Sequence, residues 1–437
     1  GLLLFLGNDE SGMNYADNTY HFRQDSTFLY FFGLPYAGLS SIIDIDNNRE
    51  IIFGDELTID AIVWMGTQPT LKEKSEAAGI TEVRPFKEID TYLKNAQQKG
   101  QPIHYLPTYR AEHQIKLFQW LGVVPGAEKP SVPFIMGVVN QRNYKSEEEI
   151  AEIEKACIVT ADMHLAAMRT VRPGIRESEV AAAVAEVAYA NNYELSFPII
   201  ATINGQTLHN HDHSNLIKSG DMLLLDAGAE TEMGYAGDMS STIPADAKFT
   251  TRQREIYDIQ VAAHEAAVAA LRPGIPFVDV YELSCKVIME GLKELGFVKG
   301  DPMEAVKAGA HAMFMPCGLG HMMGLDVHDM ENLGEIYVGY DGQPKSTQFG
   351  RKSQRLAIPL EPGFVHTVEP GIYFIPELID MWRAEKKFTD FINYDKVETY
   401  KDFGGIRNEE DYLITETGAR RLGKKIPLTP EEVEALR

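Results

Sequence analysis

The sequence predicts an α/β domain followed by a larger α+β domain that contains an internal duplication. Two observations lead to this prediction. In the first 120 residues, short apolar runs alternate with helix-like segments, as they do in α/β domains. Further along, residues 166–184 (AAMRTVRPGIRESEVAAAV) resemble residues 266–284 (AAVAALRPGIPFVDVYELS) at a spacing of one hundred residues. With 437 residues, the chain is long enough for two or three domains.

Three segments of the first domain are short and apolar enough to form strands: LLLFLG, SSIIDID and EIIFGD. Three others have the length and spacing of helices: TLKEKSEAAG, EIDTYLKNAQQKG and TYRAEHQIKLFQWLG. Strands that alternate with such helices indicate a parallel or mixed sheet. A Gly- and Pro-rich stretch at 122–133 is the best candidate for a linker. We therefore place the first domain at 1–140 and the second at 141–437.

The second domain opens on a strong helix-start signal. Ser146 and Glu149 form the S-x-x-E pattern of a capping box. Apolar residues then continue at helical spacing from Ile150 until Pro173 and Gly174 end the helix.

Each copy of the repeat is predicted to form a helix, an RPGI turn and a second helix. A histidine follows each copy, His209 in the first half and His321 in the second, and two strand-like segments with carboxylates follow each histidine. Chance similarity of two Pro-Gly turns is the alternative, but the parallel order of the later segments favours duplication. Two units related by a pseudo-twofold axis would bring their carboxylate-bearing sheets face to face.

Composition narrows the classes of function. Asp and Glu number 64 against 41 Lys and Arg, which gives a net charge of −23. A surface this acidic repels phosphate groups, so we expect no nucleic-acid partner and no membrane partner. No apolar run approaches the ~18 residues of a membrane span. The odd, widely spaced Cys157, Cys285 and Cys317 favour neither a zinc ribbon nor a disulfide framework, so a cytoplasmic protein is predicted.

Four carboxylates fall in apolar, strand-like segments of the second domain: Asp226, Asp238, Glu369 and Glu409. A single acid in such a segment is most often solvated or capped, but four that converge would repel one another. Divalent cations would relieve that repulsion, and carboxylates with an imidazole suit Mn²⁺, Co²⁺, Fe²⁺ or Zn²⁺. Two cations about 3.5–4 Å apart can activate a shared water, so the pattern points to metal-assisted hydrolysis.

The imidazole is expected in GLGHMMGLDVHD, residues 318–329. This segment has neither a helical stripe nor strand alternation, and its three glycines predict an irregular, tightly turned backbone. A single histidine here has a structural alternative, a buried ring with one satisfied hydrogen bond. For Asp326 and Asp329, turn capping or hydrogen bonding behind the site is preferred over direct catalysis.

The carboxylate and histidine segments resemble a known family. LLLDAG, GDMSST, GLGHMMGLDVHD, HTVEPGIYF and GGIRNEEDYLIT are similar, in order, to the metal-ligand segments of the pita-bread metallopeptidases of the methionine aminopeptidase/creatinase superfamily. FRQDSTFLYFFGLP (22–35) also resembles the N-terminal domain of the Xaa-Pro aminopeptidase and Xaa-Pro dipeptidase (prolidase) branch. The resemblance implies a creatinase-like N-terminal domain with a mixed sheet and a pita-bread catalytic domain. It implies an exopeptidase that cleaves the Xaa-Pro bond by attack of a metal-bridging water.

The resemblance also implies roles for individual residues. Two divalent ions, with Mn expected ahead of Co, Zn or Fe, would be held by Asp226, Asp238, His321, Glu369 and Glu409. Glu369 would also be the general base, and His328 and His209 would act at the scissile bond and bind substrate. Arg407 would orient the carboxylates from behind. The family's habit implies a homo-oligomer, most simply a dimer, formed through the N-terminal domain.

Two residues, Cys317 and Arg355, affect the expected rate of hydrolysis and the expected range of substrates. Cys317 stands where the family commonly has another histidine, four residues before His321, so this chain would manage without that imidazole. Arg355 resembles the carboxylate-binding arginine of dipeptidase-type members, although a solvated loop charge is an equal alternative. Peptides or dipeptides with Pro in the second position are therefore both expected substrates. A non-catalytic peptide-binding protein and another hydrolase on the same fold are the alternative functions.

Overall fold

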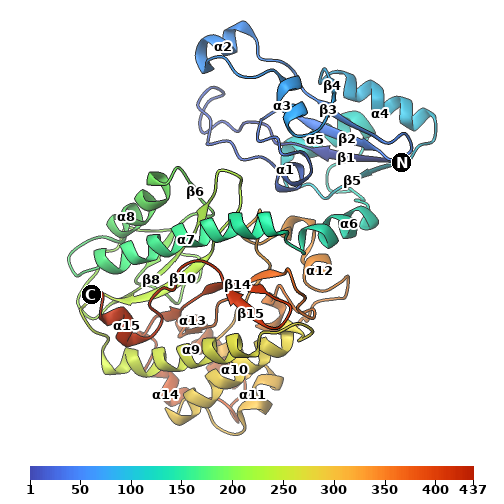
Figure 1. The fold of residues 1–437 in the computed structure, drawn as a ribbon. Helices are drawn as coiled ribbons and strands as arrows, with labels where there is room; N and C mark the ends of the chain where they lie inside the picture. The colour runs from blue at the N-terminus through green and yellow to red at the C-terminus, as the bar shows by residue number, and fades with distance from the viewer. The chain divides into compact units, whose positions relative to one another are not determined.

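The computed structural model describes all of residues 1–437. The chain forms two compact units (Figure 1). The first comprises Gly1–Gln141 and Met330–Tyr337, and the second comprises Arg142–Asp329 and Val338–Arg437. No feature of the sequence predicts that 330–337 belongs with the first unit.

The first unit is built on a five-stranded sheet in the order β4-β3-β2-β1-β5. β1 pairs antiparallel with β2, and β2 with β3, whereas β1 pairs parallel with β5, and β3 with β4. The predicted mixed sheet is therefore confirmed, and the three predicted strands are its central ones. The strands are β1 (Leu2–Leu6), β2 (Ser40–Asp44), β3 (Arg49–Phe53), β4 (Glu82–Arg84) and β5 (Ile103–Tyr105).

Helices of the first unit cover this sheet through apolar stripes. In α4, Ile89, Leu93 and Ala96 recur at helical spacing and are buried in the core with Leu4 and Phe53 of the strands. The three predicted helices are α3, α4 and α5, while the predicted linker has no helix or strand until α6 begins. The helices are α1 (Ser26–Phe32), α2 (Ile59–Met65), α3 (Leu71–Ala77), α4 (Glu88–Gln98), α5 (Ala111–Leu121) and α6 (Val132–Arg142).

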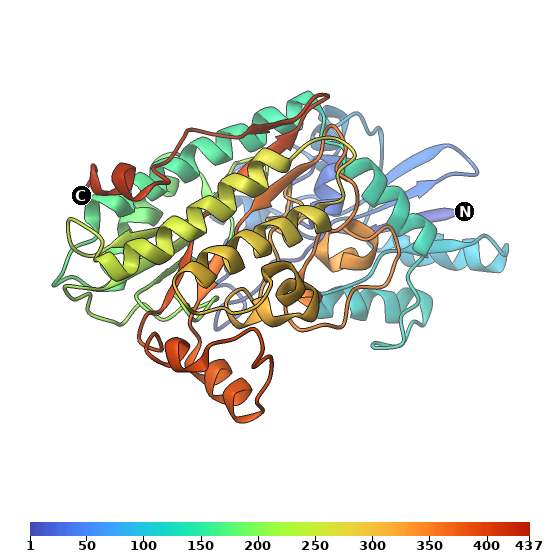
Figure 2. The same cartoon turned by 90° about the horizontal axis from the view of Figure 1, so that it is seen from below.

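Two helix pairs of the second unit follow the predicted repeat. The first helix of the first pair starts at the predicted capping box, where Glu149 N donates to Ser146 Oγ at 3.3 Å and Ser146 N donates to Glu149 Oε2 at 2.9 Å. In the second pair, the helices run side by side (yellow and gold in Figure 2). The helices are α7 (Glu147–Thr170), α8 (Glu177–Ala190), α9 (Thr251–Ala270) and α10 (Phe277–Glu294).

The two RPGI turns make equivalent contacts, which confirms the internal repeat. Gly174 N donates to Ile217 O at 2.9 Å, and in the second copy Gly274 N donates to Leu360 O at 2.7 Å. Both glycines have positive φ, 93° and 82°, a conformation that favours glycine. Each turn therefore binds the backbone a few residues before a strand of its own half, β8 (Met222–Ala227) or β11 (Val365–Val368).

The strands of the second unit form several short sheets. The larger ones have the orders β10-β8-β7 and β11-β14-β15, and β12 pairs with β13 and β6 with β9. The strands of the first half are β6 (Glu194–Leu195), β7 (Ile200–Thr202), β8 (Met222–Ala227), β9 (Ala229–Glu230) and β10 (Met239–Pro244). Those of the second half are β11 (Val365–Val368), β12 (Gly371–Tyr373), β13 (Gly405–Arg407), β14 (Glu410–Ile414) and β15 (Ala419–Arg421).

The halves meet edge to edge, so the expected face-to-face packing is wrong. Glu409 N donates to Ser240 O at 3.0 Å, and these two residues form an antiparallel bridge between β10 and the junction of β13 with β14. The backbone groups at the two strand edges satisfy each other across the repeat, which stacked sheets would not allow. One face of the joined strands is covered by α7 and α9, since His164 contacts Ser241 and Gln260 contacts the carbonyl oxygen of Pro370.

Shorter helices complete the second unit. They are α11 (Pro302–Ala308), α13 (Pro376–Ala384), α14 (Tyr394–Glu398) and α15 (Pro430–Glu434). Three of the four residues of α12 (Glu335–Val338) belong to the first unit. Among all the helices, none combines the length and the apolar character that a membrane crossing requires.

Candidate metal centre

The segment 318–329 lacks regular structure, as predicted, and all three of its glycines pack against other groups too closely for a side chain. A Cβ on Gly320 would lie 2.2 Å from the carbonyl oxygen of Thr367. A Cβ on Gly324 would lie 2.7 Å from Asp329 Oδ2. Thr367 N also donates to His321 O at 3.0 Å, so the segment is fixed against β11. The absence of a side chain at Gly320 thus lets the backbone beside His321 approach that strand.

The four predicted carboxylates come from strands or from strand ends. Asp226 lies within β8, Asp238 directly precedes β10, Glu369 directly follows β11, and Glu409 lies between β13 and β14. Three of the acids therefore sit at interruptions of the pairing rather than inside strands. All four line one cavity of about 460 Å³ together with His321.

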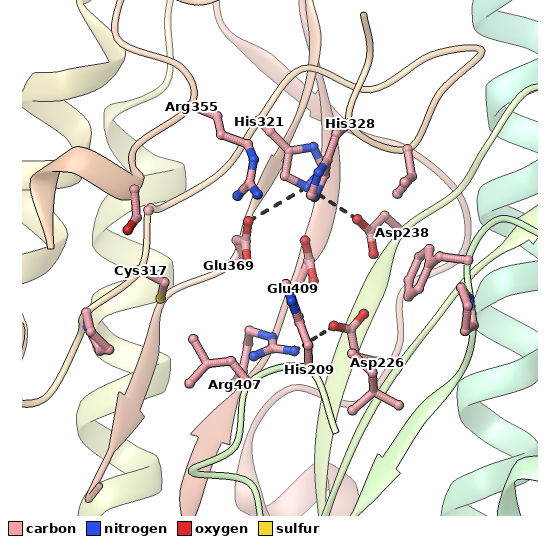
Figure 3. A pocket seen from close by; sticks show the side chains of 18 of the residues that line it. His209, Asp226, Asp238, Cys317, His321, His328, Arg355, Glu369, Arg407 and Glu409 are labelled. Atoms are coloured by element: carbon pink, nitrogen blue, oxygen red, sulfur yellow. Dashed lines mark hydrogen bonds and ion pairs between the residues drawn. The ribbon is translucent and has the colours of Figure 1, made fainter. Parts of the chain in front are cut away.

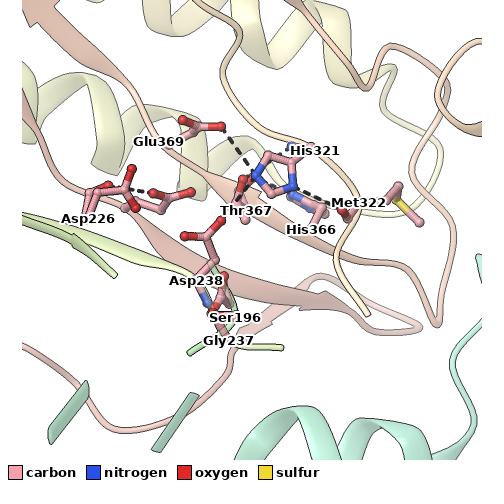
Figure 4. A network of polar contacts seen from close by, with 12 residues as sticks. Ser196, Asp226, Gly237, Asp238, His321, Met322, His366, Thr367 and Glu369 are labelled. Atoms are coloured by element: carbon pink, nitrogen blue, oxygen red, sulfur yellow. Dashed lines mark hydrogen bonds and ion pairs between the residues drawn. The ribbon is translucent and has the colours of Figure 1, made fainter. Parts of the chain in front are cut away.

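His321 lies beside Asp238 and Glu369 (Figure 4). Its Nδ1 is 3.1 Å from the carbonyl oxygen of Met322, which makes Nδ1 the protonated nitrogen. Its Nε2 is 3.4 Å from Asp238 Oδ2 and 3.7 Å from Glu369 Oε1. One donor atom each from Asp238, His321 and Glu409 lie within 4.8 Å of one another. Nitrogen and oxygen donors are thus gathered at the spacing that a divalent cation needs.

The buried acids raise the pKa values of one another. Burial raises the pKa of Asp238 well above its usual range, and the charges of Asp226, Asp411 and Glu369 raise it further, while Arg407 opposes the rise. Burial also raises the pKa of Glu409, and here the charge of Asp238 adds most.

The donor set fits divalent cations. Glu409 Oε1 is buried and has no hydrogen-bond partner. A buried, unpartnered carboxylate oxygen beside other acids and one imidazole suits Mn²⁺, Co²⁺, Fe²⁺ or Zn²⁺.

Arg407 lies beside Asp226 and below Glu369 and Glu409 in Figure 3. It donates hydrogen bonds to three different partners. Nη2 donates to Asp226 Oδ2 at 2.6 Å, Nη1 to Tyr373 OH at 2.9 Å and Nε to Ser240 Oγ at 2.9 Å. Ser240 Oγ donates in turn to Glu409 Oε2 at 2.7 Å. The guanidinium thereby fixes one acid directly and a second through a hydroxyl.

The predicted substrate residues His209, His328 and Arg355 line the same cavity. The rings of His328 and His321 meet edge to face, with centroids 4.2 Å apart. The pKa of His209 is lowered, first by partial burial of its ring and then by the positive charge of Arg407. In Figure 3, His209 and Arg407 lie on one side of the acids, and Arg355 and His328 lie on the other.

Sequence reasoning missed three residues near the site. Ser240 follows Asp238 by two positions, so strand alternation could have placed both on one face. Tyr373 follows Glu369 by four positions and had no separate signal. His211, for which the sequence predicted no role, lines the cavity. His213 Nε2 lies 3.0 Å from the carbonyl oxygen of Ile199.

Cys317 lines the cavity as a thiol. Burial raises its pKa to about 12, and the charge of Glu369 raises it too. The side chain is therefore protonated at neutral pH and is a weak hydrogen-bond donor, which cannot replace an imidazole.

Asp326 and Asp329 act in turn capping and ion pairing outside the cavity. Asp326 N donates to Asp329 Oδ1 at 3.3 Å. Arg142 Nη2 lies 2.6 Å from Asp329 Oδ1 and 3.0 Å from Asp326 Oδ2, and Lys145 Nζ lies 2.8 Å from Asp329 Oδ2. The turn capping and hydrogen bonding that the sequence predicted are therefore present, and the lack of a direct catalytic role stays a prediction.

Both domains of the chain match known protein families. The family described as Metallopeptidase family M24 matches residues 151–416, and the family described as Aminopeptidase P, N-terminal domain matches residues 1–104. The chain is 33% identical to Xaa-Pro aminopeptidase of Escherichia coli (strain K12), over 96% of this chain and 90% of that protein. It is 29% identical to Xaa-Pro dipeptidase of Homo sapiens, over 99% of this chain and 88% of that protein.

The fold also matches a solved structure. Zn-substituted aminopeptidase P of Escherichia coli, in complex with product, superposes with a TM-score of 0.80 at 30% identity, covering 100% of this chain and 93% of that one. The match to the family extends over more than half of the chain and includes every segment of the candidate metal centre. The chain therefore belongs to metallopeptidase family M24 and carries an N-terminal domain of the aminopeptidase P type.

Proposed function

We propose that this protein hydrolyses the peptide bond between an N-terminal residue and a following proline. The observation that carries the proposal is the gathering of Asp238, His321 and Glu409 donors within 4.8 Å of one another, in a cavity that Asp226 and Glu369 also line. Relatives named Xaa-Pro aminopeptidase and Xaa-Pro dipeptidase support the substrate class. Since an Xaa-Pro bond is a tertiary amide with a rigid ring, it needs a dedicated site.

The five donors would hold two divalent ions, Mn²⁺ in preference to Co²⁺, Zn²⁺ or Fe²⁺. These donors would come from Asp226, Asp238, His321, Glu369 and Glu409. When bound, such a pair supplies Lewis-acid charge stabilisation and a water nucleophile at neutral pH.

Protein side chains would perform the proton transfer and the positioning. Glu369, at the end of β11, would accept the proton of the attacking water as general base. His328, whose ring meets that of His321, would bind the substrate at the scissile bond and stabilise the tetrahedral intermediate. His209 would contact the substrate from the other side and stay neutral near pH 7, since its pKa is lowered.

Arg355 would bind the free carboxylate of a dipeptide. It lines the cavity, and a guanidinium pairs well with a carboxylate. We infer a slight preference for dipeptides from this placement. The test is turnover of Ala-Pro against Ala-Pro-Ala with added Mn²⁺, in the native protein and in Arg355→Ala. Lys352→Ala is the matched control, because Lys352 is exposed on the same loop and does not line the cavity.

The expected result is that Arg355→Ala abolishes Ala-Pro cleavage, while Lys352→Ala leaves it unchanged. Equal or better turnover of the tripeptide by the native protein would reject the dipeptidase preference and keep the peptidase class. Metal analysis tests the class itself, with about two Mn, Co, Fe or Zn ions per chain expected from a dinuclear site. No bound metal would instead support a peptide-binding protein, although retention of all five donors argues against that alternative.

We also infer a homo-oligomer, most simply a dimer, formed through the first unit. Helix α2 has no buried residue, and the exposed fractions of Ile59, Val63 and Trp64 are 75%, 73% and 86%. An apolar helix face this exposed is typical of an interaction site. Light scattering should show that Trp64→Glu lowers the mass of the particle. The control Tyr189→Glu, which replaces an exposed aromatic on α8, should leave the mass unchanged.

The three free cysteines support a reducing, cytoplasmic location.

A further inference from the structure

The hydroxyl of Ser240 connects Arg407 to Glu409 in a fixed direction. Arg407 Nε lies 2.9 Å from Ser240 Oγ, which lies 2.7 Å from Glu409 Oε2. A guanidinium can only donate, so the oxygen of Ser240 accepts from Arg407. Its single O–H is then available for Glu409. Ser240 is fully buried, so no bulk water competes for either contact.

The same residue also holds the backbone of Glu409. Glu409 N donates to Ser240 O at 3.0 Å in the bridge that joins the two halves of the repeat. Glu409 is therefore fixed at its main chain and at Oε2 by a single partner. Its other oxygen, Oε1, is buried with no hydrogen-bond partner. This arrangement leaves Oε1 as the oxygen that is available to a cation.

Because side chains alternate along a strand, Ser240 and its neighbour Ser241 point to opposite faces of β10. Ser240 and Thr242 share one face of β10, and Thr242 Oγ1 donates to the carbonyl oxygen of Arg407 at 2.9 Å. Ser241 points the other way, where its Oγ lies 2.9 Å from His164 Nδ1 of α7. Both serines are buried, and alanine at either position would remove a hydroxyl together with its hydrogen bonds. Ser241 is thus a matched control for Ser240.

We propose that Ser240 is a positioning residue for the metal ligand Glu409. Its hydroxyl holds Oε2 so that Oε1 is presented to the cation, and it couples that carboxylate to Arg407, which binds Asp226 on the other side. The inference rests on the proposed function, because it requires Glu409 to bind metal. Partners that hold a metal ligand from behind are typically worth 10- to 100-fold in metal affinity.

The test is calorimetric titration of Mn²⁺ into the full-length, chelator-treated protein and its Ser240→Ala, Ser240→Thr and Ser241→Ala variants. Ser240→Ala should weaken at least one Mn²⁺ site by about 10- to 100-fold. Ser240→Thr keeps the hydroxyl and should restore the affinity. Ser241→Ala should bind Mn²⁺ like the native protein, although loss of its contact with His164 lowers the thermal midpoint. If Ser240→Ala does not fold, Ser240→Cys replaces it, because a thiol keeps the volume but donates weakly.

Four outcomes would overturn the proposal. Native affinity in Ser240→Ala would do so while leaving the proposed function intact. An equal loss in Ser241→Ala would show that any buried change near β10 weakens binding. A Ser240→Thr protein with a native thermal midpoint and the affinity of the alanine variant would show that the hydroxyl is irrelevant. Absence of binding of all four ions, Mn²⁺, Co²⁺, Zn²⁺ and Fe²⁺, in the native protein would overturn the proposed function itself.

Discussion

At the scale of single residues, the groups that contact each buried acid of the site determine its charge environment. Asp226 and Glu409 are both buried acids, yet only Asp226 touches the guanidinium of Arg407 directly. The pKa of Glu409 is raised by burial and by its acidic neighbours, and the charge of Arg407 offsets only part of this effect. The remaining charge imbalance is what a bound cation would relieve.

Arg407→Lys should lower kcat/KM for Ala-Pro by about 10- to 100-fold, the range for groups that orient metal ligands. A lysine has one ammonium and cannot reach Asp226, Ser240 and Tyr373 at once, as the planar guanidinium does. Steady-state kinetics at saturating Mn²⁺ measure the effect. Arg421→Lys, which alters the guanidinium beside Glu410, should leave kcat/KM nearly unchanged.

His113 should make the stability of the first unit depend on pH. Burial lowers its pKa to about 4, while its Nε2 lies 3.0 Å from the carbonyl oxygen of Gly7. Because the folded-state pKa lies below the unfolded value of about 6.5, the unfolded chain binds the extra proton. The stability is fully present above about pH 6.5 and falls by up to about 1.4 kcal/mol per pH unit towards pH 4.

Chemical denaturation at several pH values measures this slope. His113→Gln, which keeps an N–H donor but does not titrate, should reduce the slope between pH 6.5 and about 4. An unchanged slope would mean that His113 titrates normally in the folded protein.

At the scale of elements, the site depends on segments that interrupt regular structure. The loop 318–329 presents His321 and His328, and it is closed by Asp329, which binds Arg142 and Lys145. All three of these charged side chains are buried, so removing one partner would leave an uncompensated charge. The loop is therefore held by buried ion pairs although it contains no helix or strand.

Gly320→Ala should destabilise the second unit by about 1–3 kcal/mol, the usual cost of overpacking. The new Cβ would lie 2.2 Å from the backbone oxygen of Thr367, and backbone moves less easily than a side chain. Urea denaturation measures the change, and Mn²⁺ affinity should fall with it because His321 is the next residue. Gly418→Ala is the control, since nothing lies within 4 Å of a Cβ at that position.

At the scale of the whole molecule, the repeat divides the proposed ligands between its halves. Asp226 and Asp238 come from the first half, and His321, Glu369 and Glu409 come from the second. A cation would therefore join the halves in addition to the hydrogen bond between Glu409 and Ser240.

The domain boundary at residues 140 and 141 stays a prediction.

Mn²⁺ should raise the thermal midpoint of the chelator-treated protein, since it binds only the folded state. One site at a hundredfold excess over Kd stabilises by about 2.7 kcal/mol. Differential scanning fluorimetry with and without Mn²⁺ measures the shift. Asp238→Ala should lose both the shift and hydrolysis, and undiminished hydrolysis in that variant would reject the dinuclear site.

Much of the architecture could be predicted because its signals are local. The capping box at Ser146, the two RPGI turns and the strands β1, β2 and β3 follow from short-range patterns of polarity and turn residues. The five proposed metal ligands were predicted from the order of five segments, and all five line one cavity in the structure. Their individual roles still await the experiments above.

The sequence by itself determined the types of the main elements, the repeat and the chemical class of the site, because propensity, periodicity and residue type act over short distances along the chain. Only the tertiary structure decided that the repeat halves join edge to edge, and that Ser240 and Tyr373 hold Arg407. Arg407 and Asp226 are 181 residues apart in the chain, and their contact depends on strand register across two halves. Register is a property of the assembled sheets, and no local pattern in either half specifies it.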